Sequence, residues 1–121
     1  MILVDTSVWI DHFRVGESAL VSLLKDCQVL GHPFVSGELA CGNLTNRTLL
    51  LNLIGDLPQS PLATQEEVMF FIEHHKLMGR GIGFIDAHLL ASTALIGSAQ
   101  LWTRDKRLAN IAKDLKMAVK Q

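Results

Sequence analysis

Acidic side chains occupy positions along the chain that favour metal chemistry. Asp5 directly follows an apolar run at residues 2–4, and Asp105 comes two residues after a predicted strand at residues 100–103. Glu38 and Asp86 each stand at the start of a predicted helix. Two carboxylates about 4 Å apart repel each other by about 4 kcal/mol at an effective dielectric constant near 20. If these acids meet, they require a cation, and hard oxygen ligands select Mg²⁺ or Mn²⁺.

Such a site predicts phosphodiester hydrolysis. A divalent ion held by carboxylates activates water and neutralises the charge of a phosphorane-like transition state. The sequence contains no nucleophile elbow and no HExxH, GxxxxGK[ST] or GxGxxG motif. Each acid also has a purely structural explanation, because Asp5, Asp86 and Asp105 suit helix caps and a first-turn Glu38 complements the helix dipole. The residues alone leave both explanations open.

The elements that must position these acids alternate along the chain. Short apolar runs at residues 2–4, 28–30 and 100–103 are separated by helical patterns with short connections. This order favours an α/β fold, a three-layer α/β/α sandwich with a central, mostly parallel sheet. Strand carboxyl ends and the following helix starts gather at one edge of such a sheet. We therefore expect Asp5, Asp86 and Asp105 to point into a common space, which Glu38 can join.

Several local expectations accompany this fold. We expect Phe34 and Val35 to continue the second strand and Ser36 to begin the helix that carries Glu38 in its first turn. A helix at residues 47–57 has a leucine-rich face, for which burial in the core is the default. The glycine-rich segment 78–83 is expected to be a mobile loop or hinge. Residues 117–119 are a candidate edge strand.

Length and composition limit the class of protein. The chain has 121 residues, a hydrophobic fraction of 49% and a formal net charge of −1, which predicts one domain, residues 1–121, with a substantial core. The two cysteines lack metal-ligand spacing, as expected for a reduced cytoplasmic protein. We expect no signal peptide, and the longest apolar stretch, residues 87–99, is too short and too polar for a membrane span.

Four short motifs occur in a fixed order: Val4-Asp5-Thr6-Ser7, Ser36-Gly37-Glu38-Leu39, Phe84-Ile85-Asp86-Ala87 and Trp102-Thr103-Arg104-Asp105. As a set with this spacing, they resemble the PIN-domain ribonucleases, most of all the VapC-type toxins of prokaryotic toxin–antitoxin pairs. The resemblance spans almost the whole chain. It implies an Mg²⁺- or Mn²⁺-dependent endonuclease that cleaves single-stranded RNA loops. It also implies a homodimer and a cognate antitoxin protein as partners.

The resemblance also assigns roles to individual residues. Carried over by position, the acidic quartet is Asp5, Glu38, Asp86 and Asp105. Asp5 and Asp86 are then the strongest metal ligands, and Glu38 either helps to hold the ion or acts as a base. Ser7 and Thr103 orient acids or water.

Basic residues flank the predicted site in the sequence. They are Arg80, Arg104, Lys106 and Arg107. Two interpretations are open, because these side chains either bind RNA phosphates or are charges on solvated turns.

Two other functions are compatible with the sequence. A phosphohydrolase of the haloacid dehalogenase type would use Asp5 as nucleophile, but that family needs a second aspartate two residues later, where Ser7 stands. In a non-catalytic, protein-binding regulatory domain the acids would be helix caps. Dependence of activity on divalent ions separates the nuclease from this regulatory domain.

Overall fold

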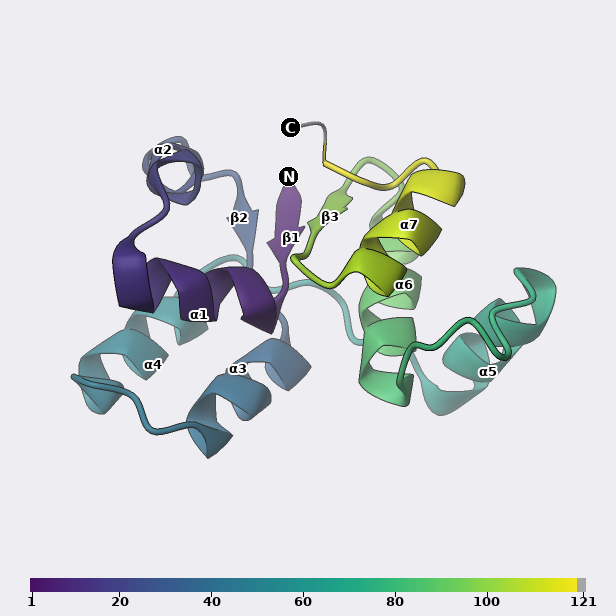
Figure 1. Ribbon diagram of the computed structural model, residues 1–121, viewed down its shortest axis with the longest axis horizontal. Coiled ribbons are helices and arrows are strands. Elements are labelled where there is room, and N and C mark those ends of the chain that lie inside the picture. The colour runs from purple at the N-terminus through teal and green to yellow at the C-terminus, as the bar shows by residue number, and fades with distance from the viewer. Residues whose placement is uncertain (120–121) are drawn as a thin grey trace.

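A small parallel sheet lies at the centre of the molecule (Figure 1). The computed structural model describes residues 1–119. Within this part of the chain, three strands pair in the order β2-β1-β3, and both pairings are parallel. The elements in chain order are β1 (Ile2–Val4), α1 (Thr6–Val15), α2 (Ser18–Lys25), β2 (Val29–Leu30), α3 (Pro33–Cys41), α4 (Arg47–Gly55), α5 (Gln65–His74), α6 (Phe84–Ile96), β3 (Gln100–Trp102) and α7 (Lys106–Asp114).

The central strand is buried, as expected for a strand covered on both faces. Leu3 is 0% exposed, and its partners in register, Leu30 of β2 and Leu101 of β3, are buried as well. Helices flank the sheet in two groups, α1 to α4 on the left of Figure 1 and α5 to α7 on its right. The predicted α/β sandwich with a central parallel sheet is confirmed.

Each strand leads directly into a helix at the same edge of the sheet. Helix α1 begins two residues after β1 ends, α3 begins three residues after β2, and α7 begins four residues after β3. In Figure 1 this edge is the lower end of the strands. Side chains from three connections therefore meet at one place. Over residues 1–119, no helix is both long and apolar enough to cross a membrane.

Helix α3 begins earlier than the sequence pattern predicts. Phe34 and Val35 do not continue β2, because the helix already starts at Pro33 and not at Ser36. Proline is favoured in the first turn of a helix. The side chain of His32 caps this end by accepting a hydrogen bond from Phe34 N–H. Histidine is not among the residues that usually signal an N-cap, so the sequence pattern puts the start of this helix at Ser36 instead.

The leucine-rich face of α4 is only partly buried, which corrects a second expectation. Ile54 is 2% exposed, but Leu49 is 59% and Leu53 55% exposed. Because α4 packs mainly against α3 on the outside of the fold, only a narrow stripe of it reaches the core. The predicted edge strand at residues 117–119 is reduced to a single parallel bridge between Leu101 and Ala118.

Candidate active site

Asp5 is the most constrained acid of the predicted site. It follows β1, is 6% exposed, and occupies the N-cap position of α1. Its Oδ2 atom accepts hydrogen bonds from Ser7 Oγ at 2.7 Å and from Thr103 Oγ1 at 2.8 Å. Among the described residues its side chain makes no capping bond to the backbone of α1. The helix-cap explanation therefore does not account for this buried carboxylate.

The two hydroxyls that hold Asp5 also join the first and last parts of the chain. Thr103 Oγ1 accepts a hydrogen bond from Asp105 N–H at 3.1 Å, and Ser7 Oγ accepts one from Arg104 N–H at 3.0 Å. The start of α1 is thereby fixed to the loop between β3 and α7. Each hydroxyl oxygen accepts a hydrogen bond from a backbone N–H, and each hydroxyl donates its single proton to Asp5.

Asp86 and Asp105 use one oxygen each at a helix start. Asp105 Oδ1 caps α7 by accepting from Arg107 N–H and Leu108 N–H, at 2.9 and 3.0 Å. Asp86 Oδ2 accepts from Gly83 N–H at 3.2 Å in the first turn of α6. The capping explanation is thus right for one oxygen of each acid. Within residues 1–119, the second oxygen of each makes no hydrogen bond and stays available to a ligand.

Glu38 lies in the second turn of α3, not in its first, because the helix begins at Pro33. Its side chain is exposed, and its Oε1 atom accepts a hydrogen bond from Thr6 Oγ1 at 2.8 Å. Thr6 immediately follows Asp5, so this bond brings Glu38 to the same edge of the sheet. Thr6 stands in the first of the four motifs without a predicted role, although a hydroxyl directly after a strand-end aspartate could have indicated one.

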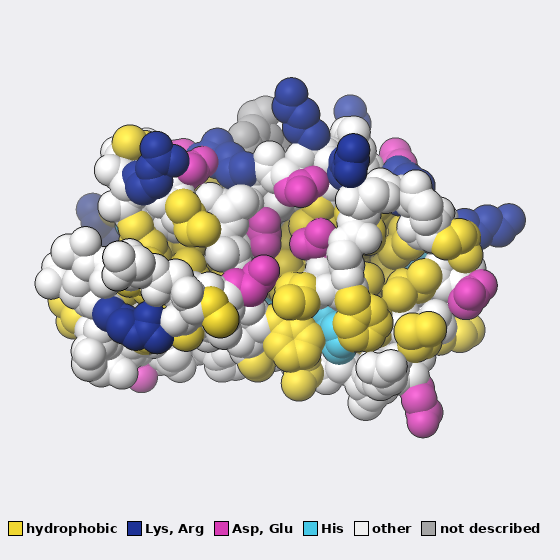
Figure 2. All heavy atoms as spheres, turned by 60° about the horizontal axis from the view of Figure 1, so that its bottom comes forward, with side chains coloured by type: hydrophobic (Ala, Val, Ile, Leu, Met, Phe, Trp, Pro, Cys, Tyr) yellow, Lys and Arg dark blue, Asp and Glu magenta, His cyan; other side chains and the backbone are white. Residues whose placement is uncertain are grey.

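The pKa of Asp86 indicates that the four acids lie close together. Burial is the largest cause that raises the pKa of Asp86 above its ordinary value, and the hydrogen bond from Gly83 N–H opposes this. The negative charges of the other three acids raise that pKa further. Figure 2 shows acidic side chains, in magenta, gathered in the middle of one face between hydrophobic surfaces. The structure thus brings together Asp5, Glu38, Asp86 and Asp105.

The comparison with known proteins decides the family. Ribonuclease VapC32 of Mycobacterium tuberculosis, strain CDC 1551 / Oshkosh, is 51% identical to this chain over 108 residues, which are 89% of this chain and 87% of the relative. The protein of the same name from strain ATCC 25618 / H37Rv matches with the same identity and coverage. The chain belongs to the VapC ribonuclease family. No family model matches the chain.

The VapC-type site has donors that suit a hard divalent ion. Free carboxylate oxygens of Asp5, Asp86 and Asp105 are the ligand type that Mg²⁺ and Mn²⁺ prefer. In the part of the chain that the structure describes, no group of three or more acidic, histidine or cysteine side chains is close enough to hold a metal ion. Mg²⁺ does not need such a group, since it usually keeps several waters and binds one or two carboxylates directly. The residues present therefore fit such an ion.

The basic residues near this VapC-type site are mostly engaged within the protein. Arg80 pairs with Asp114 at 3.0 Å. Arg104 pairs with Asp11 and Glu17, and its guanidinium lies 5.7 Å from the centre of the Trp102 ring. The side chain of Arg107 packs over Gly81, and Lys106 is exposed. Within residues 1–119, Lys106 and Arg107 are exposed and form no ion pair.

Proposed function

We propose that this protein is a divalent-metal-dependent endoribonuclease and the toxin of a toxin–antitoxin pair. The observation that carries the proposal is the buried Asp5 carboxylate, which two hydroxyls orient. Its charge, with those of Glu38 and Asp105, raises the pKa of the nearby Asp86. Such a cluster repels an RNA phosphate unless a cation lies between them. Membership of the VapC family, whose relatives carry the name ribonuclease, supports the same chemistry.

The proposed roles of the four acids follow from their burial and their hydrogen bonds. Asp5 and Asp86, which are buried and half-buried, are the principal ligands, and Asp105 contributes the oxygen that does not cap α7. A bound Mg²⁺ or Mn²⁺ supplies charge neutralisation at the phosphate and a more acidic water. Glu38, which is exposed and accepts a hydrogen bond from Thr6, would accept a proton from water. Ser7 and Thr103 keep the Asp5 carboxylate from rotating.

The substrate we propose is single-stranded or loop RNA, with hydrolysis by water. Attack by water does not use the RNA 2′-hydroxyl, so the products carry a 5′-phosphate and a 3′-hydroxyl. A 2′,3′-cyclic phosphate product would contradict this mechanism. A covalent phosphate on Asp5 would instead support the phosphohydrolase alternative.

Metal binding is the direct test. Mn²⁺ is titrated by calorimetry into the wild type, Asp86→Asn and, as a matched control, Asp56→Asn. Asp56 is exposed at the end of α4, so the control removes the same charge outside the cluster. We expect Mn²⁺ binding and RNA cleavage in the wild type and the control, and loss of both in Asp86→Asn. Equal binding by Asp86→Asn and the wild type would refute the proposed site.

The antitoxin is proposed to lie in an apolar groove between α1, α2 and α4. The groove has a volume of about 290 Å³, and its lining includes Trp9, Leu24 and Leu53. Leu53 is 55% exposed at this groove, so an apolar segment of the antitoxin would cover a side chain that the fold leaves open to solvent. Leu53→Glu should abolish antitoxin binding and leave RNA cleavage intact, as measured by pull-down and cleavage of a labelled RNA.

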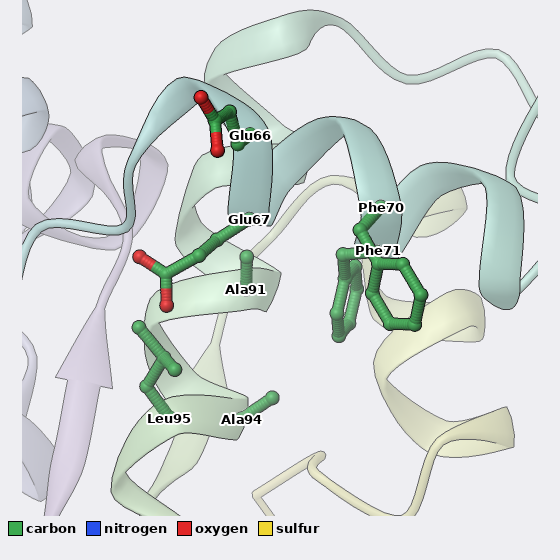
Figure 3. A pocket seen from close by; sticks show the side chains of 7 residues that line it. All are labelled: Glu66, Glu67, Phe70, Phe71, Ala91, Ala94 and Leu95. Carbon is green, nitrogen blue, oxygen red and sulfur yellow. The ribbon is translucent and has the colours of Figure 1, made fainter.

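A second copy of the chain is proposed to pack on the face formed by α5 and α6. Figure 3 shows a cavity lined by Phe70 and Phe71 of α5 and by Ala91, Ala94 and Leu95 of α6, and Glu66 and Glu67 line it as well. Phe70 is 68% and Leu95 50% exposed, and a cavity of about 370 Å³ lies between the helices. A two-fold dimer pairs the same surface patch of both copies, so this exposed apolar face would pack against its own counterpart. Light scattering of Phe70→Lys should show a monomer if this face forms the dimer.

A further inference from the structure

A buried histidine connects the two groups of helices behind the acidic site. His32 follows β2, caps α3 and is 0% exposed. Its Nδ1 atom accepts a hydrogen bond from Phe34 N–H at 3.0 Å, and its Nε2 atom lies 3.0 Å from Ser92 Oγ on α6. Beside this pair, the Phe34 ring contacts the ring of His88 with centroids 4.6 Å apart. Both contacts run from α3 to α6.

The hydrogen bonds fix the protonation of His32. A backbone N–H can only donate, so Nδ1 must be the unprotonated nitrogen. The ring proton is therefore on Nε2, which donates to Ser92 Oγ. In this neutral form the imidazole satisfies an N–H at the start of α3 and a hydroxyl of α6 at the same time. A protonated ring would lose the first of these bonds.

The hydrogen-bonded pair of His32 and Ser92 lies on the same two helices as Glu38 and Asp86. Glu38 comes six residues after His32 along α3, and Asp86 comes six residues before Ser92 along α6. Six helical residues span about 9 Å, so a rotation of α3 by about 10° about the pair moves Glu38 by about 1.6 Å. Helix α3 otherwise packs mainly against α4 and α1, which leaves these contacts to set its relation to α6.

We propose that His32 is a positioning residue: its bond to Ser92 fixes α3 against α6 and thereby sets the distance between Glu38 and Asp86. The proposal rests on the metal-dependent nuclease function proposed above. It assigns His32 no contact with RNA or metal. Losing the bond should lower kcat and weaken Mn²⁺ binding, while the KM for RNA stays nearly unchanged.

The test compares two hydroxyl deletions in the same helix. Ser92→Ala removes the partner of His32, and Thr93→Val removes a neighbouring buried hydroxyl that donates only to Leu89 O within α6. His32→Asn is a second probe, because asparagine keeps an N-cap oxygen but is too short to reach Ser92. Unfolding temperature, kcat and KM for a labelled RNA, and the Kd for Mn²⁺ are measured for each protein.

We expect kcat to fall about 10-fold or more in Ser92→Ala and His32→Asn, since a displacement of about 1 Å can cost about 100-fold. The Mn²⁺ Kd should rise in both, and Thr93→Val should keep wild-type values even where its unfolding temperature falls. If Ser92→Ala and Thr93→Val lose kcat equally, the inference is wrong and the effect is general destabilisation. If the wild type neither binds Mn²⁺ nor cleaves RNA, the proposed function itself fails.

Discussion

Acid should destabilise this protein through His32 at a pH where most carboxylates are still ionised. Burial, helped by the nearby His88, lowers the pKa of His32 from 6.5 to about 4. The folded protein therefore keeps His32 neutral at pH 5, whereas the unfolded chain binds a proton there. Because the unfolded state binds more protons, stability falls as the pH drops below about 6.5 and the loss levels off below about 4.

The size of this loss follows from the two pKa values. With about 4 in the folded protein and 6.5 in the unfolded chain, proton linkage removes about 2 kcal/mol of unfolding free energy between pH 8 and pH 5. A domain of this size has a total stability of about 5–15 kcal/mol, so the unfolding temperature should fall by roughly 5–10 °C from this group alone. Burial also lowers the pKa values of His75 and His88, which adds to the loss in the same direction.

A comparison of variants isolates the contribution of His32. Denaturant unfolding of the wild type and His32→Asn is measured at pH 8 and pH 5, and the wild type should lose about 2 kcal/mol more than the variant. The ring is also titrated directly by NMR in histidine-labelled protein, with the variant providing the assignment. A His32 ring that titrates near pH 6.5, or equal losses in both proteins, would refute the reasoning.

Two other substitutions test the site and a strained turn. Asp5→Asn keeps the shape and removes one charge, so RNA cleavage should be lost, the fold should survive, and the pKa of Asp86 measured by NMR should fall. Gly81→Ala should lower the unfolding free energy by roughly 1–2 kcal/mol, because φ is +84° and the new Cβ would lie 2.7 Å from Arg107 Cδ. Gly37→Ala is its control, since this helical position is open and alanine should stabilise it in denaturant unfolding.

The sequence predicted the sheet and its flanking helices well because these depend on local patterns. The apolar run before Asp5 has the pattern of a buried strand when helical segments flank it, and β1 occupies these residues. Topology accounts for the positions of Asp5 and Asp105, since both follow parallel strands whose carboxyl ends lie at one edge of the sheet. It does not account for Asp86, because α6 follows no strand. The residues that lie at the carboxyl edge of a parallel sheet can thus be inferred from the sequence alone.

The sequence did not predict how α3 is placed. Its start depends on a cap from His32, and that histidine is held by Ser92, which lies 60 residues away in the chain. The exposure of Leu53 depends in the same way on where α4 packs. Local patterns carry no information on such distant partners, so the turn of α3 that holds Glu38 was misplaced.

The site therefore depends on contacts between parts of the chain that are far apart. Asp5 receives one hydroxyl from its own helix and one from Thr103, at the other end of the sequence. Glu38 is held from α1 by Thr6, and its helix is tied to α6 through His32. The four acids come from four separate parts of the chain, and their mutual repulsion opposes the folded arrangement until a cation is bound. The sheet and these few polar contacts supply the free energy that balances this repulsion. Removing one of the polar contacts should therefore weaken metal binding more than it destabilises the fold.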